Sequence, residues 1–262
     1  MIILKLGGSA LTIKDADKPT IDDINLDRIA TEISDYNQDM IIVHGAGSFG
    51  HIHAKKYSIG SKIEDNSDNE NKKKGMCLTQ ASVQLLNYKV ISKLHEKNVP
   101  AIGIKPSTFI INNNKRIDEC DLNIIKRYVD EGFVPVLYGD AVLDKNSDIK
   151  YSILSGDQII TYLAKHLDVD RVILSSDVDG IYTDNPKTNP DAELIDIVTK
   201  DTLLTTTSNK DQADVTGGME GKINELLELA EYGIQSQIIN AEKEGNIKKA
   251  VSGQNVKGTI IK

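Results

Sequence analysis

Short runs of β-branched and aliphatic residues recur along the chain, and most of them end in glycine or in polar residues. Longer segments with the apolar spacing of a helix separate several of these runs. Continuous apolar strands that alternate with amphipathic helices are typical of a mostly parallel sheet covered on both faces. We therefore predict an α/β fold with strands at 2–6, 40–43, 101–104, 134–137, 171–174 and 236–239 and helices at 26–36, 79–96, 158–167 and 222–232.

Two other segments carry a local signal. Segment 61–74 (SKIEDNSDNENKKK) is polar and has no apolar period, so we predict a mobile or locally disordered loop, with a lid over a substrate as the alternative. Residues 109–117 are expected to form a hairpin, because the asparagines at 112–114 are turn residues. The sequence contains neither an internal repeat nor a Pro/Ser linker, which favours one two-lobed unit.

Charge and cysteine content exclude several classes of protein. Lys and Arg total 31 against 39 for Asp and Glu, and the resulting net charge of -8 argues against a surface for nucleic acid or anionic membranes. Cys77 and Cys120 are far apart and lie in no CxxC pattern, and no HExxH pair occurs, so disulfide frameworks and zinc sites are not expected. No apolar run approaches the roughly 20 residues that span a bilayer. These features predict a soluble protein of the reducing cytoplasm.

Two glycine loops follow predicted strands. Segment 2–6 runs into Gly7, Gly8 and Ser9 and includes Lys5, so backbone N–H groups and a cation lie beside each other. The GxxxxGK[ST] spacing of a P-loop is absent, and a plain strand-to-helix turn is the alternative. Segment 45–50 (GAGSFG) matches GxGxxG, but the acidic strand end that a dinucleotide site needs would fall in the polar segment 61–74. We therefore interpret it as an anion cradle at a helix N-terminus.

Three histidines accompany the second loop. His51 follows it directly, and an imidazole beside bound phosphate would gain protonated character and donate to a phosphate oxygen. The alternative is a surface histidine on the next helix, as we expect for His53. His44 is predicted to be a packed residue at the end of its strand.

Three more glycine or acidic clusters lie farther along the chain, at 155–157 (SGD), 177–182 (DVDGIY) and 214–219 (DVTGGM). The last of them leads to Lys222, in the first turn of a predicted helix. Any one of them is compatible with an ordinary turn. Together they place backbone donors, a lysine and carboxylates at several strand ends, which is what a phosphoryl-transfer site requires.

The order of these motifs resembles the amino acid kinase superfamily almost end to end: LKLGGS, VHGAGSFGH, YGD, SGD, SSDVDGIY with NPK, and DVTGGMEGK. The resemblance implies one three-layer α/β/α sandwich with a mostly parallel central sheet. It also implies an acceptor-binding lobe at about 1–150 and an ATP-binding lobe at about 151–262 of a single domain, 1–262.

Segment 45–57 (GAGSFGHIHAKKY), with Lys14 after LGGS, is similar to the isopentenyl phosphate kinase family. In that family the histidine matching His51 binds the phosphate of the acceptor. Ala46 stands where relatives often carry glycine; a backbone N–H contact is compatible with that change, and its effect on the room beside the phosphate stays open. The resemblance implies ATP-dependent phosphorylation of isopentenyl phosphate to isopentenyl diphosphate, Mg²⁺ bound through ATP oxygens and water, and a homodimer.

The chemistry of such an acceptor agrees with the residues present. A phosphate monoester is largely ionised near pH 7 because its second pKa is about 6. No general base is then needed, and the site has to bring two polyanions together with cations and N–H donors. No Ser/His/Asp set competes with the lysines and glycine loops for a catalytic role.

The resemblance also implies a role for each residue. Lys5 and Lys222 hold the β- and γ-phosphates, Lys14 steadies the transferring group, and Asp157 orients the lysines. The implied sets are catalytic Lys5, Lys14, His51, Asp157 and Lys222; ATP-binding Lys5, Gly7, Gly8, Ser9, Gly47, Asp177, Asp179, Gly180, Gly217, Gly218 and Lys222; and substrate-binding Ala46, Gly47, Gly50, His51, Gly156, Val83 and Leu86, with no metal ligand from the protein.

The acceptor tail is expected to enter an apolar slot whose wall is helix 79–94, where Val83, Leu86, Val90 and Ile91 recur at helical spacing. Ordinary core packing is the alternative for these residues. Three other functions stay open: a kinase for another phosphate or phosphonate, such as the fosfomycin kinases; an amino-acid, carbamate or uridylate kinase; and a non-catalytic nucleotide sensor.

Overall fold

The predicted parallel sheet is present in a computed structural model, which describes residues 1–13, 18–200 and 217–262. Within these residues the sheet has eight strands in the order β10-β12-β11-β9-β1-β2-β6-β3. Each neighbouring pair is parallel except β11 and β12, which are antiparallel. The strands are β1 (Ile2–Leu6), β2 (Met40–His44), β3 (Ala101–Gly103), β6 (Val134–Tyr138), β9 (Arg171–Ser176), β10 (Ile197–Val198), β11 (Gln235–Asn240) and β12 (Gly258–Ile261).

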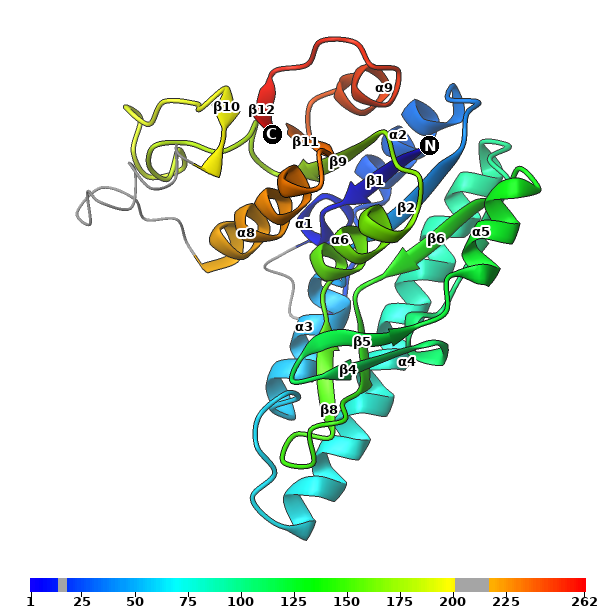
Figure 1. Ribbon diagram of the computed structural model, residues 1–262, viewed down its shortest axis with the longest axis vertical. Helices are drawn as coiled ribbons and strands as arrows, with labels where there is room; N and C mark the ends of the chain where they lie inside the picture. Colours follow the sequence, from blue (N-terminus) through cyan, green and yellow to red (C-terminus); the bar gives the residue numbers. More distant parts are fainter. Residues whose placement is uncertain (14–17, 201–216) are drawn as a thin grey trace.

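Helices cover both faces of this sheet (Figure 1). Successive side chains of a strand point to opposite faces, so Leu4 of β1 lies in one apolar core and Ile3 in the other. The three-layer α/β/α sandwich is thereby confirmed. On the side of Leu4 lie α2 (Asp23–Ser34), α4 (Asn66–Glu96) and α9 (Asn246–Val251), and on the side of Ile3 lie α5 (Asn123–Asp130), α6 (Gly156–His166) and α8 (Gly217–Glu231).

All six predicted strands and all four predicted helices are found, with boundaries that differ by a few residues except in α4. Strand β12 was not predicted, although its antiparallel pairing with β11 completes one side of the sheet. Its sequence, Gly258–Ile261, is too short and too close to the chain end to show a period. The short helix α9 escaped prediction for the same reason.

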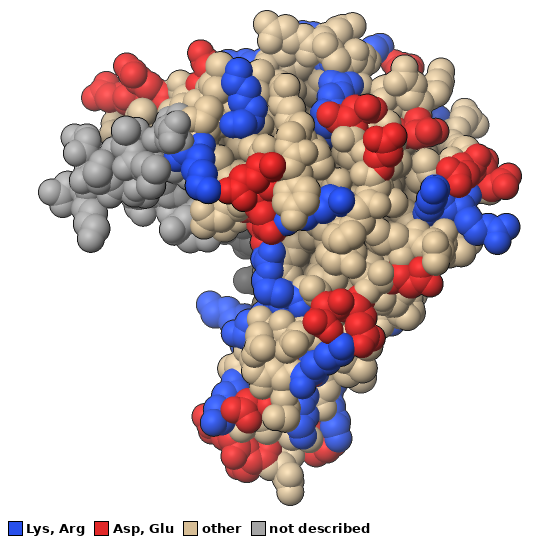
Figure 2. Space-filling model, in the orientation of Figure 1, with Lys and Arg blue, Asp and Glu red and all other residues tan. Residues whose placement is uncertain are grey.

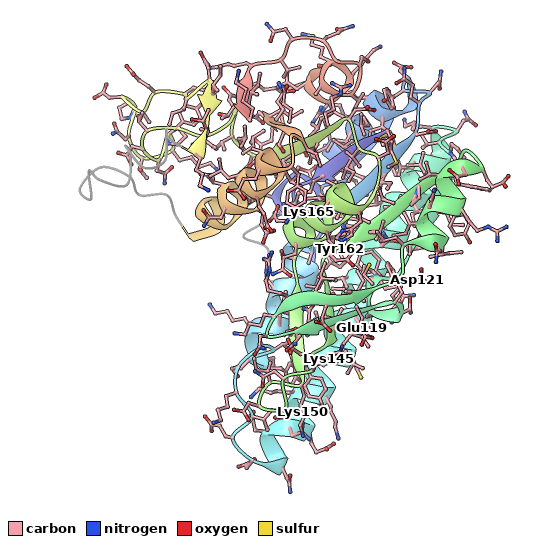
Figure 3. The ribbon with its side chains drawn as sticks, in the orientation of Figure 1. Glu119, Asp121, Lys145, Lys150, Tyr162 and Lys165 are labelled. Atoms are coloured by element: carbon pink, nitrogen blue, oxygen red, sulfur yellow. The ribbon has the colours of Figure 1, made fainter. Side chains whose placement is uncertain are left out.

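Two hairpins and the helices α3 (Gly47–Lys56) and α4 extend away from the sheet in the lower half of Figure 1. The predicted hairpin is confirmed as β4 (Ile110–Asn113) and β5 (Arg116–Cys120), with its turn at Asn114 and Lys115, which have φ values of 51° and 66°. Lys145 lies beside this hairpin and its Nζ is 2.5 Å from Glu119 Oε1 (Figure 3). A second hairpin was not predicted; it pairs β7 (Asp140–Leu143) with β8 (Tyr151–Leu154).

The prediction of a loop or lid at 61–74 is wrong from Asn66 onward, because α4 begins there. The Asp65 side chain caps the helix by accepting a hydrogen bond of 2.8 Å from the Asp68 amide. Lys72 is only 2% exposed; its ammonium pairs with Asp68 and donates to the Lys62 carbonyl at 2.8 Å. A polar helix of this kind is held by capping and by contacts with neighbouring loops, so its sequence shows no apolar period.

Acidic and basic side chains are interspersed over the face shown in Figure 2. Among the described residues, none of the helices has the length and apolar character required to cross a membrane.

Candidate active site

Two glycine loops meet at the carboxyl ends of the adjacent strands β1 and β2. A Cβ atom built on Gly8 would lie 2.5 Å from the Gly47 nitrogen, and one built on Gly45 would lie 2.6 Å from the Gly8 nitrogen. These separations are shorter than any van der Waals contact, so only glycine allows the two backbones to pack together. The sheet therefore places both predicted anion-binding loops at one point, as parallel strands do at their carboxyl edge.

Helix α3 begins at Gly47, directly after the second loop. Gly47 has a φ of +50°, and Ala46 provides no side-chain cap for the helix. Thr12 Oγ1 accepts a hydrogen bond of 3.2 Å from the Ser48 amide. An N-terminus of this kind attracts anions because its first amides point outward along the helix dipole.

The Ala46 methyl group packs beside Gly50, in the first turn of α3. A Cβ atom on Gly50 would lie 2.4 Å from Ala46 Cβ, and Ala46 packs against the core on the side of α4. Gly50 therefore makes the room that the methyl group needs. Ala46 is also part of the cavity lining.

A cavity of about 960 Å³ opens in front of these loops. It is lined by the ends of β1, β8 and β9, by the loop after β2, by the N-terminal parts of α3 and α6, and by Lys222 of α8. It brings together most of the predicted site residues: Lys5, Gly7, Gly8, Ser9, Ala46, Gly47, Gly50, His51, Gly156, Asp157, Asp177, Gly180 and Lys222.

Three predicted site residues cannot be placed in this way. Lys14 lies outside the described residues. Gly217 and Gly218 are at the start of α8, and the structure describes nothing further of their surroundings.

Lys5 forms an ion pair across the floor of the cavity. Its side chain is 6% exposed, and its Nζ donates to Asp157 Oδ1 at 2.6 Å. Asp157 is in the first turn of α6, where Ser155 caps the helix by accepting from the Gln158 amide at 3.1 Å. The carboxylate thus holds the ammonium in a fixed place, at the wall formed by β1 and α6.

His51 and Lys222 face the same space from α3 and α8. Burial, followed by the positive charge of Lys222, lowers the pKa of His51 below its ordinary value. Both effects oppose protonation of the imidazole, which is expected from the sequence only beside bound phosphate. A phosphate between the two side chains would reverse this effect, because it would attract both positive charges.

The opposite end of the cavity is formed by the segment after β9. Asp177 lines it and pairs with Lys187 at 2.5 Å. Asp179, in contrast, is not part of the lining: it is 6% exposed and lies 2.7 Å from Lys243 Nζ and 3.1 Å from Lys257 Nζ. Its prediction as an ATP contact is corrected accordingly, because its carboxylate anchors the loop from behind.

The cluster around Asp179 predicts a pH-dependent stability. Burial raises the pKa of this carboxyl, but hydrogen bonds from Lys243, Lys257 and Asn240 outweigh burial and lower it from 3.8 to about 2. The folded pKa lies below the unfolded one, so the stabilisation is complete above about pH 4 and is lost as the pH falls through about 2. We expect Asp179→Asn to reduce the free energy of unfolding by about 2 kcal/mol at neutral pH.

Urea unfolding of the wild type and of Asp179→Asn over a pH series measures this effect. The difference between them should shrink as the pH falls from about 4 towards 2. Asp191→Asn is the matched control, because Asp191 is an exposed carboxyl near the same loop. A difference between wild type and Asp179→Asn that stays constant over this range would contradict the prediction.

The apolar wall of the cavity differs from the predicted one. Val83 and Leu86 are both fully buried in the core between α4 and the sheet, and neither is part of the lining. The helical spacing of Val83 and Leu86 therefore comes from core packing, the alternative that the sequence left open for these residues. The apolar lining near His51 comes instead from α3, α4 and β8: Ile52, Ala54, the Thr79 methyl group, Ile153 and Leu154.

Sequence analysis also missed Asp140, which lines the cavity and is 2% exposed. Its carboxylate accepts hydrogen bonds from the amides of Ser107 at 3.2 Å and Ala141 at 2.8 Å. Burial is the largest influence on the Asp140 carboxyl and raises its pKa. Asp140 belongs to the YGD motif at residues 138–140, but the motif by itself does not indicate a role for the carboxylate.

Among the described residues, histidine, cysteine, aspartate and glutamate form no group of three or more that could hold a metal ion. Four aspartates line the cavity, and each has a partner: Asp157 and Asp177 pair with Lys5 and Lys187, and the carboxylates of Asp140 and Asp184 accept hydrogen bonds from amide groups. This arrangement fits a Mg²⁺ ion that is coordinated by phosphate oxygens and water.

Comparison with known proteins gives one consistent result. Residues 1–240 match the model of the amino acid kinase family. The chain is 49% identical over 262 residues to isopentenyl phosphate kinase of Methanothermobacter thermautotrophicus, covering 100% of this chain and 98% of the relative. It is 38% identical over 271 residues to isopentenyl phosphate kinase of Methanocaldococcus jannaschii, with the same coverage.

Solved structures agree with these sequence relatives. One isopentenyl phosphate kinase superimposes with a TM-score of 0.91 at 47% identity, covering 100% of both chains. A product complex of isopentenyl phosphate kinase from T. acidophilum superimposes with a TM-score of 0.80 at 28% identity, again covering 100% of both. A UMP kinase from Ureaplasma parvum shares the fold, with a TM-score of 0.62 at 21% identity.

Proposed function

The chain belongs to the amino acid kinase family, and on that premise we propose that its cleft transfers the γ-phosphoryl group of ATP to isopentenyl phosphate. The observation that carries the proposal is His51, which faces the cavity from the first turns of α3 beside the loop amides. A histidine there recognises an acceptor that is itself a phosphate. The two sequence relatives described above bear the same name, isopentenyl phosphate kinase.

The transfer needs no proton to be removed from the acceptor. An oxygen of the isopentenyl phosphate dianion attacks the γ-phosphorus of ATP, the bond to the β–γ bridging oxygen breaks, and ADP leaves with that oxygen. The products are isopentenyl diphosphate and ADP. The demand on the protein is to neutralise and align two polyanions, which the lysines and amides of the cavity are suited to do.

Each end of the cavity takes one substrate in this proposal. Lys5 and Lys222 hold the β- and γ-phosphates, while His51 and the amides of Ala46, Gly47 and Gly156 hold the acceptor phosphate. Asp177 and the glycines of 217–218 border the nucleotide, and Lys14 steadies the transferring group. Mg²⁺, bound to the ATP oxygens and water, supplies further charge neutralisation.

The division of labour follows the chain: residues 1–150 form the acceptor lobe and residues 151–262 the ATP lobe. The tail of the acceptor packs against Ile52 and Ile153, which are 38% and 37% exposed beside His51. Covering these two side chains removes apolar surface from water, which favours binding of an isoprenoid tail. A homodimer and a cytoplasmic location stay predictions.

A coupled ADP-release assay with Mg·ATP tests the proposal directly. Isopentenyl phosphate, fosfomycin and glutamate are offered in parallel under the same conditions. We expect turnover on isopentenyl phosphate and none on glutamate, because a carboxylate acceptor does not call for His51. Activity on fosfomycin alone would move the function to a phosphonate kinase, and ATP binding without turnover on any acceptor would indicate a nucleotide sensor.

A further inference from the structure

His44 is a buried histidine that the proposed reaction does not use. It is the last residue of β2, has 0% exposure, and its strand neighbours are Leu6 of β1 and Tyr138 of β6. Its ring stacks on Tyr138 with centroids 5.4 Å apart and planes 20° apart. The sequence-based prediction of a packed strand-end residue is confirmed, but packing alone does not account for its two polar contacts.

Each ring nitrogen of His44 has a partner that determines its protonation. Nδ1 lies 3.0 Å from the Gly45 carbonyl oxygen, which can only accept, so Nδ1 carries the hydrogen. Nε2 lies 3.1 Å from Nδ2 of Asn87, which also donates to the Val136 carbonyl at 3.4 Å. Nε2 therefore accepts, and the ring is neutral in the Nδ1–H form. Burial lowers the pKa of His44 to about 4, so this form holds at neutral pH.

The hydrogen bond from Nδ1 sets the orientation of a peptide group in the anion-binding loop. The Gly45 carbonyl and the Ala46 N–H belong to one planar trans unit and point in opposite directions. The Gly45 amide is itself held by the Leu6 carbonyl at 2.8 Å. With both ends of Gly45 fixed, the Ala46 N–H has to point away from His44, towards the cavity that Ala46 and Gly139 line.

We propose that His44 is a positioning residue for the acceptor phosphate: its Nδ1–H holds the Gly45 carbonyl and thereby presents the Ala46 N–H to that phosphate. The proposal rests on the proposed function, since the phosphate in question is that of the acceptor. His44 itself touches no substrate. Its two contacts connect α4, through Asn87, to the loop that binds the anion.

A pair of substitutions separates this role from simple packing. The side-chain amide nitrogen of asparagine occupies about the place of Nδ1, and that of glutamine about the place of Nε2. His44→Asn therefore keeps a donor for the Gly45 carbonyl, whereas His44→Gln moves the donor towards Asn87. We expect His44→Gln to raise KM for isopentenyl phosphate by about tenfold while KM for ATP changes little, and His44→Asn to stay close to wild type for both.

Several outcomes would overturn the proposal. Equal increases in acceptor KM for both variants, or parallel increases in the KM for ATP and for the acceptor, would indicate packing alone. An unchanged acceptor KM in His44→Gln would show that the loop needs no side-chain support. Thermal unfolding of each variant identifies losses that come from destabilisation.

A measurement on the wild-type protein keeps the proposal testable if neither variant folds. Nitrogen-15 NMR of the histidine rings reports which ring nitrogen carries the hydrogen. We expect His44 as the Nδ1–H tautomer, and the Nε2–H tautomer would refute the proposed hydrogen bond. Turnover of the wild type on isopentenyl phosphate, measured in the same series, tests the proposed function separately. The His44 proposal is tested by the ratio of acceptor KM between each variant and the wild type, and by the tautomer of His44.

Discussion

Lys5→Met is expected to lower kcat on isopentenyl phosphate by about 100- to 1,000-fold. The ammonium of Lys5 is buried at the floor of the cavity and is held 2.6 Å from Asp157 Oδ1, so its position is fixed before any substrate binds. Charge that is already in place stabilises the transferring phosphoryl group without reorganisation. Methionine keeps much of the apolar stem of lysine but carries no charge. Steady-state kinetics at saturating ATP and acceptor measure the change.

Lys248→Met is a matched control for this substitution. Lys248 is an exposed lysine on α9 and is not part of the cavity lining. Its Nζ pairs with Asp35 Oδ2 at 2.6 Å. We expect its kcat to equal that of the wild type. Urea unfolding of Lys5→Met is also needed, because Asp157 loses its partner in that variant. A folded Lys5→Met protein with wild-type kcat would show that Lys5 does not stabilise the transferring group.

The second large effect is expected for His51→Ala: an increase of about 100-fold in KM for isopentenyl phosphate, with a smaller change for ATP. The physical reason is the loss of a charge-assisted hydrogen bond to the acceptor phosphate beside the N-terminus of α3. His51→Gln retains one N–H donor and should recover part of the affinity. Initial rates over a range of acceptor concentrations, at saturating ATP, give the KM values.

The pH dependence of this effect has a definite sign. Burial and the charge of Lys222 lower the pKa of His51, and a phosphate bound beside the imidazole would raise that pKa. A proton is therefore taken up on binding, so the contribution of His51 is largest at low pH and declines as the pH rises through the pKa of the bound state. The ratio of KM between His51→Ala and wild type cancels the titration of the acceptor and should fall with rising pH.

His53→Ala is the control for His51, because His53 is on the same helix and is not part of the cavity lining. Its substitution should leave the acceptor KM unchanged. If both histidine variants behaved alike, the effect would come from the stability of α3. A KM ratio that rises with pH, or a His51→Ala protein with wild-type KM, would remove the basis for a phosphate acceptor.

Elements whose apolar pattern lies within a few consecutive residues could be predicted from the sequence, and elements held by polar contacts could not. The strands around Lys5 and Arg171 are continuous apolar runs, so their positions could be predicted from neighbours in sequence alone. The first part of α4, residues 66–78, was missed because its polar surface is held by the Asp65 cap and by the buried Lys72. The contacts of this segment are polar, and one of them, from Tyr151 of β8 to Asn69, joins residues far apart in sequence, so a search for an apolar period does not detect this part of the helix.

The same limit applied to the site: the sequence identified candidate residues, but it did not show which of them lie together. Glycines at 8 and 45 marked the two loops, yet only the sheet order shows that they pack on each other. Asp179 belongs to an acidic motif that predicted an ATP contact. Its carboxylate instead pairs with Lys243 and Lys257 and is not part of the cavity lining. Asp177 and Asp179 lie in the bend after β9, where no strand period fixes the direction of a side chain, so sequence alone does not tell which of them faces the ligand.

The sequence by itself determined the alternation of strands and helices, the glycine positions and the lysines, because each depends on chain chemistry within a few residues. Tertiary structure decided which of these groups share a cavity. It placed Lys222 close enough to His51 to lower the pKa of that imidazole, and it buried His44 between Asn87 and the Gly45 carbonyl. Such relations arise from strand order and helix packing, which bring distant residues within a few ångströms, and electrostatic interactions act over that distance in space whatever the separation along the chain.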